Sequence, residues 1–159
     1  MKRNTNILQL LLLGTVIIVF LSIFIFFDLS NRIDYNELTE VSISNANGLA
    51  CVYDKYTLTH KDEGWVATKS SFGVDDACEI VVDDAFITKI KDILVENNVH
   101  RWDGFDKKLT YIHDASSVEF SMRFSDGKEI KASGYATYPK NFYTVFNEFK
   151  NLFEELFSE

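Results

Sequence analysis

The chain has 159 residues, with 24 acidic side chains against 16 lysines and arginines, which gives a formal net charge of −8. Aromatic residues make up 14% of the sequence and there is one proline, a composition typical of a packed domain rather than a disordered chain. Because nucleic acids and anionic lipid headgroups attract basic surfaces, the acidic balance argues against binding to either.

Residues 7–27 form a largely apolar stretch without a charged side chain, in which only Gln9, Gly14, Thr15 and Ser22 are mildly polar. As a helix this stretch would reach about 30 Å, the thickness of the hydrocarbon core of a bilayer. Lys2 and Arg3 precede it, and positive charge of this kind favours a cytoplasmic tail. The pattern predicts a cytoplasmic tail at 1–6, a single transmembrane helix at 7–27 in the cell membrane, a linker at 28–40, and an extracytoplasmic domain at 41–159.

A cleaved signal peptide is the alternative interpretation of the same stretch. It requires a shorter apolar core and a small-x-small cleavage site, and residues 26–30 offer no such site. We therefore expect an uncleaved signal-anchor. Outside the cytoplasm, Cys51 and Cys78 could form a disulfide. The alternative is that both are unpaired thiols packed as small apolar residues.

The first half of the predicted domain contains strands and one helix. Alternating and β-branched residues predict a strand at 41–45, a hairpin of 49–60 with 65–70, and a short strand at 80–82. Asp83 has the position and type of a helix N-cap. The apolar residues that follow it recur at three- and four-residue spacing, which predicts an amphipathic helix ending near residues 97–98.

The second half begins with a predicted loop at 100–114 that contains Trp102 and Tyr111. Clean alternation then predicts a hairpin of 117–124 with 129–135. Asn141 is a predicted N-cap, and eight apolar positions at helical spacing predict a helix from Phe142 to the end of the chain.

The turn of the second hairpin can be predicted from side-chain parity. A two-residue loop would pair Arg123 with Ile130 and bring charge onto the apolar face. A three-residue loop, 125–127, pairs Met122 with Ile130 and leaves Gly127 at a left-handed position. We therefore predict the three-residue loop.

Together these elements predict an α+β fold of two layers. An antiparallel sheet would be covered on one face by two helices, in the order ββαββα, after the N-terminal transmembrane helix.

No arrangement of residues in the sequence indicates catalysis. His60 and His113 are the main titratable candidates, but no nucleophile signature accompanies them. An acidic group could gather calcium, although its spacing does not match an EF-hand loop and a solvated loop with a helix cap explains it better. This group comprises Asp75, Asp76, Glu79, Asp83 and Asp84. The cysteines and histidines lack zinc-site spacing, so we expect neither metal nor cofactor.

Aromatic residues in the connecting segments are the preferred binding candidates. Tryptophan and tyrosine are common at interfaces, and a cluster of them at one end of the sheet would form a recognition surface. The alternative is that they pack against the sheet edge and hold the loops. The predicted ligand-binding residues are Trp102, Asp103, Phe105, Tyr111, Tyr135 and Tyr138, with Arg101 at the rim and Tyr143 nearby.

Several short motifs carry a resemblance. These are Trp-Asp-Gly-Phe at 102–105, Phe-Ser-Asp-Gly-Lys at 124–128, Ala-Ser-Gly-Tyr at 132–135 and Tyr138-Pro139. Residues 102–159 resemble small uncharacterised bacterial proteins in which a membrane anchor or lipoprotein signal precedes one extracytoplasmic domain. The resemblance implies a bacterial, envelope-facing domain and brings no activity with it.

The leading prediction is thus a membrane-anchored, extracytoplasmic binding domain rather than an enzyme. Its partners would be the bilayer, through residues 7–27, and an envelope protein or polymer. One alternative is an extracytoplasmic hydrolase that uses His113 or His60. The other is a small subunit of a membrane complex recognised through its transmembrane helix.

Overall fold

The computed structural model of the chain describes residues 33–47, 52–71 and 77–158. Nearly all of these belong to one compact unit, Tyr35–Glu159. The predicted transmembrane helix at 7–27 lies outside the described residues. Within the described ranges, no helix is both long and apolar enough to cross a membrane.

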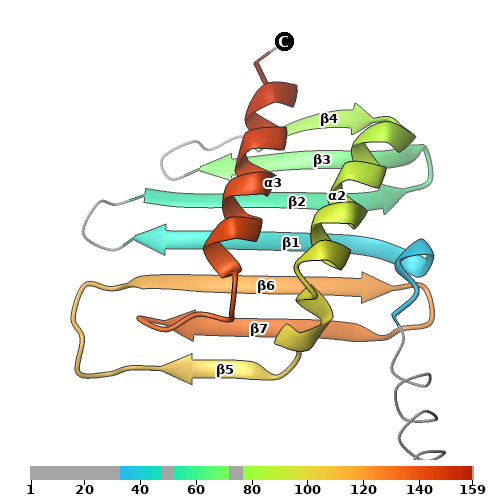
Figure 1. The fold of residues 1–159 in the computed structure, drawn as a ribbon. Helices are drawn as coiled ribbons and strands as arrows, with labels where there is room; N and C mark the ends of the chain where they lie inside the picture. Colours follow the sequence, from blue (N-terminus) through green and yellow to red (C-terminus); the bar gives the residue numbers. More distant parts are fainter. Residues whose placement is uncertain (1–32, 48–51, 72–76, 159) are drawn as a thin grey trace, which may run out of the picture. The chain divides into compact units, whose positions relative to one another are not determined.

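Seven strands form a single sheet in the order β4-β3-β2-β1-β6-β7-β5 (Figure 1). The longest strands, β1 and β2, have ten residues each, and β1 pairs with both β2 and β6. Neighbouring strands are antiparallel except β5, which is parallel to β7. The strands are β1 Leu38–Asn47, β2 Val52–Lys61, β3 Gly64–Ser71, β4 Cys78–Val82, β5 Phe105–Lys108, β6 Ser116–Phe124 and β7 Glu129–Tyr135.

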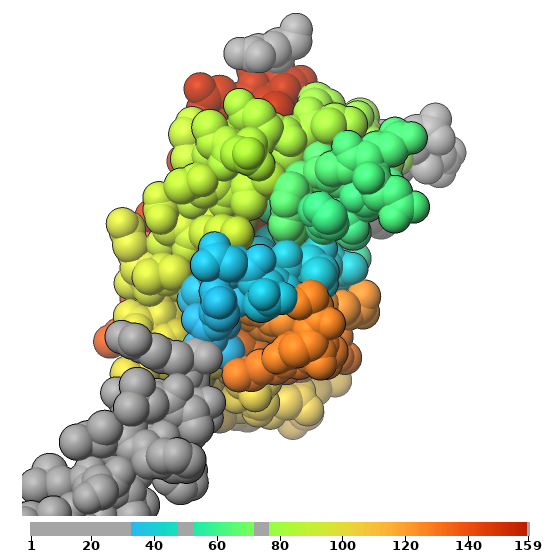
Figure 2. All heavy atoms as spheres, turned by 90° about the vertical axis from the view of Figure 1, so that its right-hand side faces the viewer, coloured from blue at the N-terminus to red at the C-terminus, as the bar shows by residue number. Residues whose placement is uncertain are grey.

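Both α-helices, α2 Asp84–Glu96 and α3 Phe142–Leu156, lie on the same face of this sheet (Figure 1). Figure 2, which looks from the end with the β2–β3 and β6–β7 turns, shows α2 to one side of those turns. The described residues also include two short 3-10 helices, η1 Tyr35–Glu37 and η2 Val99–Trp102. The class is α+β.

The hydrophobic core lies between the helices and the sheet. In the middle of the central strands, every second residue points toward the helices and is buried, as the period of a β-strand requires. The sheet contributes Val41, Ile43, Tyr56, Leu58, Phe120, Met122 and Ile130, and the helices contribute Ile90, Leu94, Phe146, Phe149 and Phe153.

Both predicted residues occupy helix N-cap positions, but only one caps with its side chain. Asp83 has extended backbone, and its Oδ1 accepts a hydrogen bond from the Phe86 N–H at 2.9 Å. Asn141 is the N-cap residue of α3, but its backbone is left-handed with φ 62° and its side chain makes no capping hydrogen bond. A tight turn causes this, because the Phe142 N–H donates to the Pro139 carbonyl and leaves Asn141 outside the extended region that a capping side chain needs.

The predicted three-residue turn between β6 and β7 is confirmed. Met122 pairs with Ile130, and Arg123 pairs with Glu129 rather than with Ile130. Gly127 has φ 83°, and its N–H donates to the Phe124 carbonyl at 3.0 Å.

The predicted ββαββα order and the wholly antiparallel sheet were wrong. Four strands precede α2, and three lie between α2 and α3. Residues 100–114 were predicted to be a loop but contain η2 and β5. The sequence of β5 is Phe-Asp-Lys-Lys, and these residues do not alternate because the strand lies at the sheet edge and is largely exposed.

Candidate functional site

The face of the sheet opposite the helices is rich in hydroxyl groups. On β1, Ser42 and Ser44 alternate with the core positions. They are only 8% and 4% exposed, because longer side chains surround them. Thr57 on β2 lies beside Ser42, and its hydroxyl donates to the Ser42 Oγ at 3.2 Å. We call this side of the sheet the uncovered face.

One row of side chains crosses five strands of the uncovered face. Ser44 is the register partner of Lys55 on β2 and of Glu119 on β6. Glu119 in turn pairs with Ser133 on β7, and Ser133 with Asp106 on β5. Neighbouring strands lie about 4.8 Å apart, so the row places Lys55 and Glu119 roughly 10 Å apart at the backbone, with a serine between them.

A second row runs parallel to the first. Thr57, Ser42, Ser121 and Lys131 are successive register partners on β2, β1, β6 and β7. The two rows together present a small, hydroxyl-lined floor between charged side chains.

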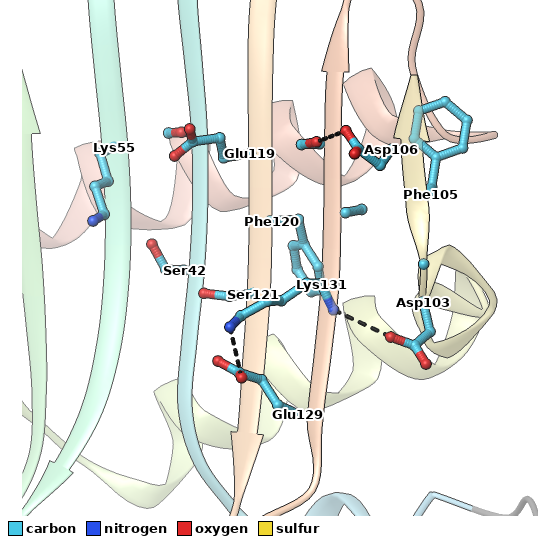
Figure 3. Close-up of a pocket in the computed structure, with 14 residues that line it drawn as sticks. Ser42, Lys55, Asp103, Phe105, Asp106, Glu119, Phe120, Ser121, Glu129 and Lys131 are labelled. Atoms are coloured by element: carbon cyan, nitrogen blue, oxygen red, sulfur yellow. Dashed lines mark hydrogen bonds and ion pairs between the residues drawn. The ribbon is translucent and has the colours of Figure 1, made fainter. Parts of the chain in front are cut away.

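This floor belongs to a shallow depression of about 580 Å³ on the uncovered face (Figure 3). The Gly104–Phe105 segment, where the chain enters β5, closes one side of it. The full lining is Ser42, Ser44, Lys55, Asp103, Gly104, Phe105, Asp106, Glu119, Phe120, Ser121, Glu129, Lys131, Ala132 and Ser133.

Several of the charged groups in the depression already have partners. The Lys131 Nζ lies 2.7 Å from a Glu129 carboxylate oxygen, and Arg123 Nε lies 3.1 Å from the other oxygen. Hydrogen bonds from Lys131 and Arg123 lower the pKa of Glu129. Asp106 accepts from the Ser133 hydroxyl at 2.6 Å, and Asp103 accepts from the Lys131 N–H at 3.3 Å.

Lys55 and Glu119 are different, because neither makes a hydrogen bond or ion pair with another residue in the described ranges. Tyr53 lies near them on β2. Burial raises the pKa of the Tyr53 hydroxyl, the nearby charge of Glu119 raises it further, and a hydrogen bond with Ser44 opposes both. Among the described residues that line the depression, Lys55 and Glu119 are therefore a cation and an anion without an ion-pair partner.

Trp102, the first of the predicted aromatic binding residues, is a core residue. It is 4% exposed and packs edge-on against Phe120 with 5.0 Å between ring centroids. The predicted exposed surface therefore does not include it. A tryptophan after a predicted helix is equally compatible with core packing, and only the position of η2 against the sheet distinguishes the two roles.

Asp103 and Phe105 do line the depression. Asp103 belongs to the segment that leads into β5, whereas Phe105 is the first residue of β5 and the register partner of the core residue Ala132, so its ring lies on the helix side of the sheet. The Lys107 Nζ lies 5.2 Å from the centroid of the Phe105 ring.

The remaining predicted aromatic residues lie elsewhere. Tyr135 accepts a hydrogen bond at its hydroxyl from the Ala115 N–H at 3.3 Å. Tyr138 packs against Tyr143 at 4.9 Å, and burial together with a hydrogen bond to Tyr138 raises the pKa of Tyr143 to about 12. Tyr111 is 75% exposed. Tyr138 also stacks on Phe142, which packs against Trp102. Of the six predicted residues, Asp103 and Phe105 line the depression and the other four do not.

The residues of the alternative predictions are also separated. His60 packs against Trp65 with 5.1 Å between centroids, and His113 lies in an exposed segment. Within the described ranges neither histidine has a side-chain hydrogen-bond partner that could complete a catalytic group.

The predicted metal and disulfide residues lie partly inside and partly outside the described part of the chain. In the described part, no three metal-ligating side chains come together. Glu79 pairs with Lys61 at 3.0 Å, and Asp83 caps α2. Asp75 and Asp76 lie outside the described residues, as does Cys51. Cys78 is exposed on β4, and the disulfide stays a prediction.

Sequence reasoning missed the hydroxyl floor. The signal that could have found it was the polar half of each alternating strand, above all Ser42 and Ser44 opposite Val41 and Ile43. Comparison of the chain with models of protein families and with curated proteins finds no match.

Proposed function

We propose that the chain is a binding module that holds a polar polymer of the cell envelope against its uncovered face. The observation that carries this proposal is the row in which Lys55 and Glu119 flank Ser44 without ion-pair partners among the described residues. Charged groups at the protein surface that are not paired internally can form charge-assisted hydrogen bonds with a ligand.

The floor between these charges supports a ligand with many hydroxyl and amide groups. Serine and threonine hydroxyls both donate and accept hydrogen bonds, so they suit a partner that carries the same kinds of group. A polysaccharide of the envelope has this chemistry and an extended shape that fits a wide, shallow depression.

In this proposal the apolar segment 7–27 anchors the domain outside the cytoplasmic membrane, as the sequence predicts. The anchor keeps the uncovered face near the polymer, and the module acts by binding rather than by catalysis. The acidic charge of the chain, −8, limits adsorption to anionic lipid headgroups and leaves the domain available to its ligand.

Co-sedimentation with isolated peptidoglycan tests the proposal. The full chain, solubilised in detergent, is incubated with the insoluble polymer and the bound fraction is measured. We expect Lys55→Glu and Glu119→Lys each to reduce the bound fraction at least tenfold. Lys91→Glu on α2 makes the same charge change as Lys55→Glu, on the helix side of the sheet, and serves as its matched control. Absence of binding by the wild-type chain, or equal loss in the control, would contradict the proposal.

A further inference from the structure

The two edge strands of the sheet differ in how they are protected. β5 ends in Lys107 and Lys108, and charged side chains of this kind discourage a further strand from pairing. β4 has the sequence Cys-Glu-Ile-Val-Val, without lysine or proline, and Val81 is 65% exposed. The one charged side chain of β4, Glu79, pairs with Lys61 of β2. A largely apolar edge strand with unpaired backbone groups is a template for pairing with another strand.

An apolar groove of about 610 Å³ lies beside β4 on the helix side of the sheet. Ile80, Val82 and Phe86 form one part of it, and Leu152 and Leu156 of α3 form another. Lys89 and Glu155 also line the groove, and neither forms an ion pair with another residue in the described ranges. The free edge and the groove thus offer backbone hydrogen bonds and apolar contacts to the same incoming strand.

We propose that β4 pairs with β4 of a second copy of this chain, antiparallel and about a two-fold axis. An interface of this type uses the same patch on both copies, so the patch must be complementary to the same patch on the second copy. With the axis at Ile80, Ile80 faces its equivalent, and Val81 faces Glu79 of the second copy. The pairing would continue the sheet and join the two apolar grooves.

The charges of the groove favour a second copy as the occupant. Among the described residues that line each groove, Lys89 is a cation and Glu155 an anion without an ion-pair partner, while Asp83 is engaged as the cap of α2. Two copies related by an axis can therefore match opposite charges, whereas an unrelated acidic or basic strand would leave one of them unmatched. Anchoring in one membrane would also raise the effective concentration of one copy around another.

The register makes the proposal testable with charge variants. Val81→Glu places glutamates opposite Glu79 at two equivalent positions, and like charges directly opposite destabilise strand pairing. Val81→Lys places lysines there instead and should preserve pairing. Val95, 51% exposed on α2 and absent from the groove lining, provides the matched control Val95→Glu.

Sedimentation equilibrium of the full chain in detergent measures the association. We expect the wild-type chain, Val81→Lys and Val95→Glu to dimerise, and Val81→Glu to raise the dissociation constant at least tenfold with an unchanged melting temperature. A second measurement uses Cys78 in a Cys51→Ser background. The proposed register separates the two Cys78 residues by about 14 Å along the strands, within reach of a bismaleimide of that length.

Two results would overturn the proposal. One is a wild-type chain that stays monomeric at all accessible concentrations. The other is a Val81→Glu variant that dimerises or crosslinks through Cys78 as well as Val95→Glu does, which would place any association on another surface. Neither result depends on polymer binding, so the edge pairing and the proposed function are tested separately.

Discussion

Trp102 Nε1 donates a hydrogen bond to the main-chain carbonyl of Lys140 at 3.0 Å. This bond ties η2 to the turn that precedes α3. The indole also packs against Phe142 with 5.7 Å between centroids. Both contacts are largely shielded from water, since Trp102 is 4% exposed. The residue therefore stabilises the junction between the second half of the sheet and the C-terminal helix.

Replacing Trp102 should reduce stability. We expect Trp102→Ala to lower the free energy of unfolding by about 3–5 kcal/mol, because it leaves a cavity in the core. Trp102→Phe should cost less, about 1–3 kcal/mol, largely because the Lys140 carbonyl loses its partner. Urea denaturation followed by circular dichroism measures both. Tyr111→Ala is the control, because Tyr111 is exposed and should change stability by less than about 0.5 kcal/mol. If Tyr111→Ala lowers the free energy of unfolding as much as Trp102→Ala does, the assignment of Trp102 to the core is wrong.

The β6–β7 hairpin could be predicted in detail from the sequence because one face of it is buried. Pairing Met122 with Ile130 keeps apolar side chains together, and any one-residue shift would bring Arg123 into the core. The helices were predictable for the same reason, since their apolar positions recur at helical spacing. In each case the burial pattern is visible within one short segment.

Other features depend on contacts between distant segments. β5 forms through parallel pairing with β7, and no local pattern in Phe105–Lys108 indicates it. The uncovered face exists because α2 and α3 both lie on the opposite side. Ser44, Lys55 and Glu119 are ordinary polar residues in sequence, and they meet only because β1 is placed between β2 and β6.

Gly134 on β7 allows a close approach that other residues cannot make. A Cβ atom at this position would lie 2.0 Å from the Thr137 carbonyl oxygen, well inside contact distance. Gly134→Ala must therefore displace backbone in the segment after β7. We expect Gly134→Ala to lower the free energy of unfolding by about 1–3 kcal/mol or more. Urea denaturation measures this loss.

Gly127→Asn supplies the comparison for this variant. Gly127 has φ 83°, and nothing lies within 4 Å of a Cβ built there. Asparagine tolerates left-handed backbone, so Gly127→Asn should lower the free energy of unfolding by less than about 1 kcal/mol. A Gly134→Ala variant as stable as Gly127→Asn would show that the chain after β7 adjusts freely, contrary to expectation.

Tyr56 should make the protein sensitive to alkaline pH. Its side chain is fully buried between the rings of Phe146 and Phe153, and its hydroxyl has no hydrogen-bond partner in the described part of the chain. Burial raises the pKa of this hydroxyl, and the negative charges of Asp54 and Glu154 raise it further. The folded protein therefore retains a proton at Tyr56 that the unfolded chain releases near pH 10.

The sign of the effect follows from proton binding. Above about pH 10 the unfolded chain binds fewer protons at this position than the folded protein, so stability falls as the pH rises. One tyrosine contributes a slope of up to about 1.4 kcal/mol per pH unit.

Tyr56→Phe removes this contribution and also the unpaired hydroxyl. We expect it to be at least as stable as wild type at pH 7 and to lose less stability between pH 10 and 12. Urea denaturation across this range measures the slope, with Tyr111→Phe as a control that should behave like wild type. A Tyr56→Phe variant with the wild-type slope would show that other groups, such as Tyr143, control the alkaline transition.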